Sequence, residues 1–515
     1  MQLSRKTFFS LTALLFGVTA SGVNAQQKEA VKIPPTGKLE SSAARVMDFS
    51  SLPDVAPEGT KVRTNPFRPT IPMSLYNRLK TTPPANSAGS GKTALGGINP
   101  LAATKIKLYE GLNQAQSADS GGTWSPSDCN GAVSPTYYVE VTNAAVGVFT
   151  RGGTNKSIKP LSVFFGYTTQ PLFDPHIKYD SVWGRWIVTA TAFPEDADHM
   201  ALCIAVSTTS NPLGSYYQYR LNVAFHSNDF WDYQKIGLTQ DAVLFNANVF
   251  NGNNFSGASL FSVAKALLYN GYGFSVPIWQ GLGATLTLPV VQDQSAVAYL
   301  IYPNMGSRTI GTYALYNASH AYDAFVLNGP NVDVGITLNY PPTNARQPGT
   351  ADVIDTLDGR FAGNTVQVGN VIYGSHCIAL GSFPAINVIG IDVAANTKIL
   401  QKYLFANAIS DDFNSQVAVN AAGDIAVAWS STNWSNWSAT VGYPAIYING
   451  KLAGGVFASK SKSLFNSSVP YSGFRWGDYT SLDVDPVDGK TFWGVNQYAK
   501  PDGSWGTKFY NLGVN

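Results

Sequence analysis

Acidic or amide side chains stand directly before several strand-like apolar runs, and this arrangement recurs along the chain. If those runs are strands arranged about one axis, the side chains circle a single opening. Carboxylates that share an opening repel one another unless positive charge neutralises them, and oxygen ligands of this kind suit a hard cation such as Ca²⁺. The side chains are Asn130, Asp174, Asp232, Asn414 and Asp478. The carboxylates among them, Asp174, Asp232 and Asp478, are the predicted Ca²⁺ ligands.

Large aromatic residues stand next to these acids in the sequence. A sugar needs paired hydrogen-bond donors and acceptors beside an aromatic face, so the same opening would also suit a glycan. The aromatic residues are Trp231, Tyr233, Trp476 and Tyr479. A purely structural role stays open for each acid, because Asp and Asn before a strand commonly accept hydrogen bonds from turn amides.

Signature motifs of several enzyme classes are absent from the sequence. It contains no Gly-x-Ser-x-Gly, no His-Glu-x-x-His and no EF-hand loop. Two of the acids named above could still serve as the paired carboxyl groups of a glycosidase. Our leading hypothesis is a binding module for a glycan or protein ligand. The alternatives are a carbohydrate-active enzyme (a glycoside hydrolase or polysaccharide lyase) and a structural surface protein.

The elements that would position these residues form a recurring unit. Each copy is an apolar–x–apolar run, often followed by Asp or Asn, then a turn with Gly or Asp, then a second apolar run. The copies begin near residues 137, 177, 236, 297, 353, 417 and 482, about 40 to 65 residues apart. Four short strands with their turns need that length, which is one propeller blade. We therefore predict an all-β chain with a single β-propeller of about seven blades; a β-sandwich with long loops is the alternative.

The N-terminus has the features of a signal peptide. Arg5 and Lys6 precede an apolar run that is too short to cross a bilayer, and Val23-Asn24-Ala25 supplies small residues for cleavage near Ala25. We predict a signal peptide at 1–25 and a protein that is secreted or periplasmic in a bacterium. Residues 26–105 are rich in Pro, Gly and Ser, so we expect an extended segment without a packed sheet. Residues 106–515 form the predicted propeller domain.

The overall charge excludes some partners. The formal net charge is +2 and charged residues make up 13% of the chain, which gives no electrostatic basis for binding nucleic acid. No later stretch is long and apolar enough to span a membrane. We expect a monomer with a glycan or protein ligand.

One short segment, residues 117–124, fits the pattern Ser-x-Asp-x-Gly-x-Thr-Trp. It resembles the Asp box of sialidases, which is a hairpin turn on a propeller rim. Because the box is a turn on the rim in that family, the resemblance implies fold and not catalysis. The segment departs from the sialidase pattern in occurring only once and without a sialidase-like arginine cluster. Chance similarity in a Gly- and Ser-rich turn is the alternative.

Five ordered motifs between about residues 125 and 510 resemble a family of secreted bacterial β-propeller-like proteins with no assigned activity. The resemblance implies export and fold, and it implies no reaction. Trp231 stands where the family pattern has proline, which affects the shape of the opening. The motifs are residues 128–139 (compare DTNGAVGPNHYV), 174–186 (DPxVxYD…xRW), 204–216 (AVSxTxDPTGxY), 228–237 (xDFPDYPKxG) and 475–493 (RWGDYSxxxxDPxDxxxFW).

Overall fold

Antiparallel β-strands dominate the chain, which confirms the all-β prediction. The computed structural model describes residues 31–54, 61–64, 67–81, 103–119, 122–335, 341–433 and 442–514. The predicted signal peptide lies outside these residues. Strand sequences such as that of β12 (Arg185–Ala192), Arg-Trp-Ile-Val-Thr-Ala-Thr-Ala, are rich in β-branched and aromatic residues and are buried almost throughout, as expected for strands covered on both faces.

Within the described residues, seven antiparallel units follow one another, and strands pair with their neighbours in sequence order. Unit 1 contains β7 (Asn130–Val133), β8 (Tyr137–Thr142), β9 (Ala145–Thr150) and β10 (Asn155–Pro160). Unit 2 contains β11 (Leu172–Asp180), β12, β13 (Ala201–Ser207) and β14 (Ser215–Asn222). Unit 3 contains β15 (Asp229–Leu238), β16 (Ala242–Asn251), β17 (Asn254–Ala264) and β18 (Phe274–Leu282). Unit 4 contains β20 (Val297–Pro303), β21 (Thr309–Tyr316), β22 (Phe325–Asn328) and the short β23 (Val332–Asp333).

The remaining units complete the series. Unit 5 contains β26 (Thr365–Val368), β27 (Val371–Leu380), β28 (Phe383–Asp392) and β29 (Thr397–Leu404). Unit 6 contains β30 (Asp411–Val419), β31 (Ile425–Thr432), β32 (Ala445–Lys451) and β33 (Lys462–Asn466). Unit 7 contains β34 (Ser481–Val484), β35 (Phe492–Ala499) and β36 (Trp505–Gly513), and its outer strand is the much earlier β5 (Thr104–Asn113). The short β19 (Pro289–Val291) pairs in parallel with β15 and β26, which links units 3 and 5.

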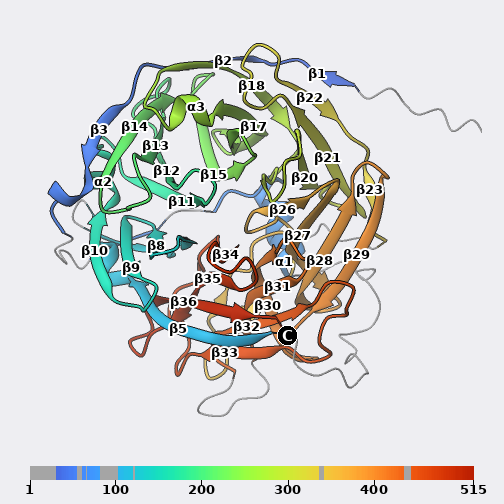
Figure 1. Cartoon of the computed structure of the whole chain (residues 1–515). Coiled ribbons are helices and arrows are strands. Elements are labelled where there is room, and N and C mark those ends of the chain that lie inside the picture. The colour runs from blue at the N-terminus through green and yellow to red at the C-terminus, as the bar shows by residue number, and fades with distance from the viewer. Residues whose placement is uncertain are drawn as a thin grey trace, which may run out of the picture.

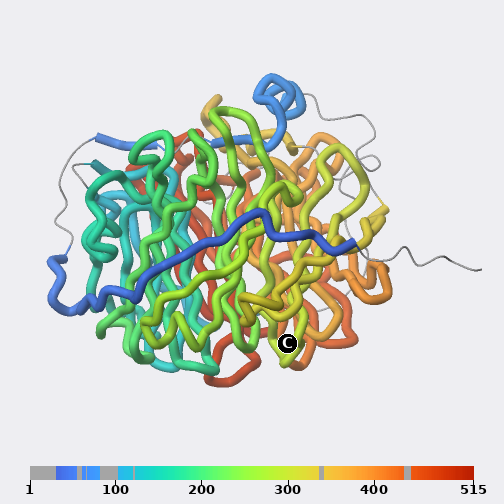
Figure 2. The backbone as a smooth tube through the Cα atoms, turned by 90° about the horizontal axis from the view of Figure 1, so that it is seen from above, coloured from blue at the N-terminus to red at the C-terminus, as the bar shows by residue number. Residues whose placement is uncertain are grey.

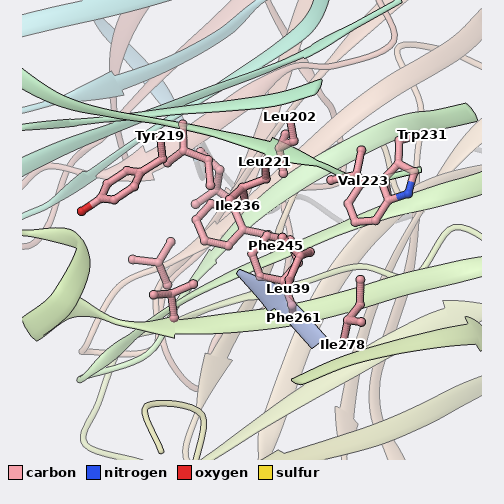
Figure 3. Packing of buried hydrophobic residues seen from close by; sticks show 14 of the residues in the cluster. Leu39, Leu202, Tyr219, Leu221, Val223, Trp231, Ile236, Phe245, Phe261 and Ile278 are labelled. Carbon is pink, nitrogen blue, oxygen red and sulfur yellow. The ribbon is translucent and has the colours of Figure 1, made fainter. Parts of the chain in front are cut away.

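The units lie side by side around a common centre, with β11, β15 and β34 near the middle (Figure 1). Each pair of neighbouring units shares a cluster of buried apolar side chains, and units 7 and 1 share one as well. At that last junction the rings of Tyr138 and Phe509 stack with centroids 4.5 Å apart. Figure 3 shows the cluster between units 2 and 3. A single sheet unit cannot cover both of its faces, so the ring of contacts supplies the core.

The N-terminal segment pairs with the outer edges of three units, contrary to our expectation that it would enter no packed sheet. β1 (Lys32–Ile33), β2 (Gly37–Ser41) and β3 (Arg45–Asp48) pair with β22, β18 and β14 respectively. The prolines fall between or after these strands, where no ladder hydrogen bond is lost. We call residues 31–54 the belt; Figure 2 shows it in blue, running across the outside of the units.

A few short elements lie outside the units. β4 (Val62–Thr64) pairs in parallel with β6 (Thr123–Ser125), and β24 (Ala345–Arg346) pairs with β25 (Val353–Ile354). The helices are α1 (Met73–Thr81), α2 (Leu161–Phe165) and α3 (Lys265–Leu268), with 3-10 turns at Phe49–Ser51 and Gln114–Ser117. In the described part of the chain, no helix is long and apolar enough to cross a membrane.

Several predicted repeat starts coincide with the strand nearest the centre. Those at 177, 236, 417 and 482 fall inside β11, β15, β30 and β34. The start at 137 is instead the second strand of unit 1, and the start at 353 falls in β25, ahead of unit 5. The segment at 353 resembles the other copies because its apolar residues are followed by an acid, Asp355. That acid instead pairs with Lys80 and Arg475, and the segment does not lead into the first strand of a unit.

Candidate functional site: an acidic mouth at one end of the axis

A repeated backbone kink places the predicted acids. Asp128, Asp174, Tyr233 and Asn414 all have positive φ, between 45° and 60°. The last three lie at irregularities in strand pairing, where β11, β15 and β30 each carry extra residues relative to their partner strand. Asp and Asn tolerate this left-handed conformation better than most residues. The kink thus accounts for the residue type at Asp128, Asp174 and Asn414, and such bulges re-aim nearby side chains.

The kinks bring carboxyl groups from different units together. The Asp478 amide donates to Asp128 Oδ1 at 2.8 Å, which joins units 7 and 1. The Tyr233 amide and the Tyr479 hydroxyl both donate to Asp174 Oδ2, at 3.1 and 2.8 Å, which joins units 3 and 7 to unit 2. Asp174 also interacts electrostatically with Asp232. We call Asp128, Asp174, Asp232 and Asp478 the acidic mouth; the predicted convergence of three of them is thus seen in the geometry.

Burial disfavours the ionised form of these carboxyl groups and raises their pKa values. Burial, followed by the charge of Asp478, raises the pKa of Asp128 to about 7. Burial also raises the pKa of Asp174 well above its usual value, with Asp232 as the next contributor. The pKa values of Asp232 and Asp478 are raised by burial as well, although nearby arginines oppose the shift. Close carboxyl groups with displaced pKa values can share protons near neutral pH.

Two buried arginines, which the sequence analysis did not single out, supply positive charge at the mouth. Arg475 donates to Asp478 and pairs with Asp355 at 3.2 Å. Arg360 forms a two-pronged pair with Asp358, at 2.7 and 2.9 Å, and its guanidinium carbon lies 4.3 Å from the centre of the Tyr233 ring. Arg475 could have been found from the sequence, because it lies in the motif Arg-Trp-Gly-Asp with one of the predicted acids. Arg360 could not, because its segment resembles an ordinary turn between two strands.

These arginines bear on the calcium prediction. Within the described residues, no group of three or more His, Cys, Asp or Glu side chains is arranged to hold a metal ion. One oxygen of Asp174 already accepts two hydrogen bonds and Asp478 accepts from Arg475, so the set fits a Ca²⁺ ion poorly. A Ca²⁺ site at Asp174, Asp232 and Asp478 stays a prediction.

The aromatic residues expected to stack on a sugar are buried. Trp231 is 0% exposed and packs in the apolar cluster between units 2 and 3 (Figure 3), so its assignment to the ligand site was wrong. Neighbouring residues of a strand face opposite sides, and Trp231 faces the core. Tyr233, Trp476 and Tyr479 are 3%, 2% and 0% exposed. Tyr233 and Tyr479 stack on each other at 4.8 Å, while Trp476 packs on Phe413.

The two predicted asparagines have different positions. The side-chain amide of Asn414 donates to the carbonyl of Tyr479 at 3.3 Å, next to the mouth, and its Oδ1 is buried without a hydrogen-bond partner. Asn130 lies deeper, in β7, where its Oδ1 accepts from the Ile177 amide at 3.1 Å. Asp128, two positions earlier in the same motif, has the mouth position instead.

Residues 67–81, which we call the cap, lie against this mouth. α1 stands on one face of the ring in Figure 2. The ring of Phe67 lies 4.8 Å from the guanidinium carbon of Arg360 and 5.1 Å from that of Arg475. From α1, the Tyr76 hydroxyl donates to Asp355 Oδ1 at 3.1 Å, and Lys80 Nζ lies 2.7 Å from Thr356 Oγ1. The cap was missed because its proline-rich sequence has no regular apolar period.

A small cavity lies beside the mouth, next to Arg360. A cavity of about 10 Å³ lies among Asp355, Asp358, Arg360, Asn414 and other residues, which is room for roughly one water molecule. The other end of the axis is wider: a funnel of about 490 Å³ is lined in part by Lys178, Asp180, Lys265 and Asp483. Its charges are paired, Lys178 with Asp483 at 2.8 Å and Lys265 with Asp180 at 2.6 Å.

The chain matches no family model and no curated protein. Among solved structures, it is similar to a protein of unknown function from Dyadobacter fermentans, at 8% identity and a TM-score of 0.40 over 80% of this chain and all of that one. It is similar to the subtype N10 neuraminidase-like protein of A/little yellow-shouldered bat/Guatemala, at 9% identity and a TM-score of 0.37 over 59% of this chain and 90% of that one. The exo-beta-1,3-galactanase of Phanerochaete chrysosporium gives 10% identity and 0.30, over 78% and 99%. At these scores the likenesses support no functional conclusion.

Proposed function

We propose that the chain is an exported seven-bladed β-propeller that binds a glycan or protein ligand at the acidic mouth. The observation that carries the proposal is the meeting of carboxyl groups from units 1, 2, 3 and 7 with two arginines at one end of the axis. Buried charged groups gathered at one opening are costly for stability, and functional sites are where such costs are commonly found.

Each antiparallel unit corresponds to one proposed blade. The count of seven is supported by the seven apolar clusters between neighbouring units, because the last of them joins unit 7 to unit 1. The outer strand of unit 7 comes from β5, early in the sequence, so the two ends of the chain close the ring together. Export is supported by the N-terminal sequence pattern alone.

A carbohydrate-active enzyme is the second candidate. A glycosidase needs one carboxyl group that is protonated and another that is ionised at its working pH. The raised pKa of Asp128, about 7, beside the carboxyl group of Asp478 favours such a division. The cap contacts Asp355, Arg360 and Arg475 in this region, so a sugar would have to displace the cap residues Phe67 and Tyr76.

The test is a binding screen of the full chain on a glycan array and a peptide array. A second form carrying Phe67→Ala and Arg68→Ala is screened beside it, because the cap covers the mouth. We expect ligands whose binding falls at least tenfold in Asp232→Asn, a change of similar shape. The matched control is Asp54→Asn on the belt, which is exposed and remote from the mouth.

The outcomes separate the candidates. Hydrolysis or elimination of a bound oligosaccharide, lost in Asp232→Asn, would select the enzyme. Ligands retained at full strength in Asp232→Asn, or no ligand in either form, would contradict a binding site at the acidic mouth and leave the structural surface protein.

A further inference from the structure

The cap holds the mouth through an aromatic ring placed on two cations. Phe67 lies between the guanidinium groups of Arg360 and Arg475, at 4.8 and 5.1 Å, and Tyr76 of the same segment packs on Phe67 with ring centroids 5.0 Å apart. Cations are attracted to aromatic faces, more strongly where water is excluded. Both arginines are already paired with carboxylates, so they offer flat, charge-balanced surfaces that suit an aromatic ring.

The next residue of the cap complements the acids. The Arg68 guanidinium carbon lies 3.6 Å from the centre of the Phe230 ring. Its charge opposes the burial that raises the pKa of Asp232, which means that it favours the ionised carboxylate. An aromatic residue followed by a basic residue therefore matches the two features of the mouth, its guanidinium pair and its acid.

The fit of this segment is incomplete. Arg68 Nη1 and Arg475 Nε are buried without hydrogen-bond partners, and so is Asn414 Oδ1. A buried donor without an acceptor costs free energy that a better-matched segment would recover. The cap nevertheless stays in place because it is tethered between β4 and β5 in the sequence, which gives it a high effective concentration at the mouth.

We propose that the acidic mouth is a peptide site for an aromatic–basic residue pair, and that Phe67-Arg68 of the cap is its resident occupant. The proposal rests on the function proposed above and names its ligand: a polypeptide segment presenting such a pair in trans. Phe67-Arg68 must be displaced before that partner binds, so the described form is the closed one. The helical end, held by Tyr76 and Lys80 on Asp355 and Thr356, keeps the cap attached when Phe67-Arg68 is displaced.

The test uses a fluorescein-labelled synthetic peptide with the sequence of residues 61–72, which contains Phe67-Arg68. Its binding is measured by anisotropy to the full chain and to the full chain carrying Phe67→Ala and Arg68→Ala. We expect the double variant to bind the peptide at least tenfold more tightly than the natural chain, because its own pair no longer competes. Adding Asp232→Asn should abolish the gain, and a control peptide with both alanine changes should not bind.

Circular dichroism and thermal melting check that the double variant is folded; Arg68→Gln alone is the milder second variant, expected to show the same direction of change. Equal peptide binding by the natural chain and by both folded variants would overturn the proposal, as would equal binding of the control peptide. If the peptide test fails in this way but the arrays yield ligands whose binding depends on Asp232, the peptide proposal is wrong and the proposed binding function is still supported. Peptide exchange that depends on Asp232, together with Asp232-dependent array ligands that are all peptides, would support the peptide site and count against a glycan ligand.

Discussion

At the scale of single residues, burial controls the charge of the chain's acids. Glu140 is 0% exposed, yet both its carboxylate oxygens are used: Oε2 accepts from the Leu112 amide at 3.1 Å and Oε1 from the Thr507 hydroxyl at 2.5 Å. Burial outweighs these hydrogen bonds and raises the pKa of Glu140 to about 7. The protonated form is therefore favoured in the folded state relative to the unfolded chain.

This shift predicts a pH dependence with a definite sign. A raised folded-state pKa contributes stability that is present below the unfolded value of 4.5 and is lost as the pH rises through about 7. The loss is on the order of 3 kcal/mol for this group. Glu140→Gln does not titrate; its amide oxygen can accept from the Leu112 amide and its NH2 group can donate to the Thr507 hydroxyl. The free energy of unfolding of this variant should therefore fall less than that of the natural chain between pH 5 and pH 8. Urea unfolding at the two pH values measures this; parallel losses in both proteins would show that Glu140 does not titrate in this range.

The residues of the mouth were predictable only in part. Asp174, Asp232 and Asp478 could be placed because each lies at the start of the innermost strand of its unit or just before it. Residues that recur at this position along the chain come close together around the axis. The direction of side chains could not be derived in the same way: Trp231 faces the core although the next residue, Asp232, lies beside Asp174 in the mouth. Arg360 and Arg475 were missed because their position beside the acids of other units, Asp232 and Asp128, depends on contacts between residues far apart in the sequence.

At the scale of elements, the belt is part of the core and not merely an attachment. Leu39 of β2 is 3% exposed and belongs to the cluster between units 2 and 3, where Figure 3 shows it beside Phe261 and Ile278. Its backbone pairs with β18. An edge strand that adds both hydrogen bonds and an apolar side chain stabilises the sheet that it joins.

Removing that side chain should therefore be costly. Leu39→Ala should lower the free energy of unfolding by about 2–5 kcal/mol, the range for a buried leucine. Lys38→Ala, at the exposed neighbouring position, should change it by less than about 0.5 kcal/mol. Chemical denaturation of both variants makes the comparison. If the two changes have equal effects, the belt is not packed as described.

The belt and the cap also show what local sequence could not reveal. Proline and glycine correctly indicated an extended course, since the belt strands are short and separated by prolines. Their partners could not be foreseen, because each strand pairs with a unit hundreds of residues away along the chain. The cap contacts depend on Asp355 and Thr356, which lie in the segment that resembled an ordinary repeat.

At the scale of the whole molecule, the same geometry provides stability and the proposed site. Seven apolar clusters join neighbouring units, and the kinks at the strand starts turn polar groups toward one end of the axis. The chain's own N-terminal residues then run along the outside of units 2, 3 and 4, and the cap covers that end. The all-β class was accessible from strand periodicity and turn composition; the order of closure, with β5 completing unit 7, was not, because it depends on pairing between the two ends of the chain.

The most direct test of this account is a crystal structure of the full chain at neutral pH. We predict units arranged around one axis, with Asp128, Asp174, Asp232 and Asp478 around a single opening and Phe67 between Arg360 and Arg475. Two stacked sheets, or these four carboxyl groups on opposite faces of the molecule, would contradict it.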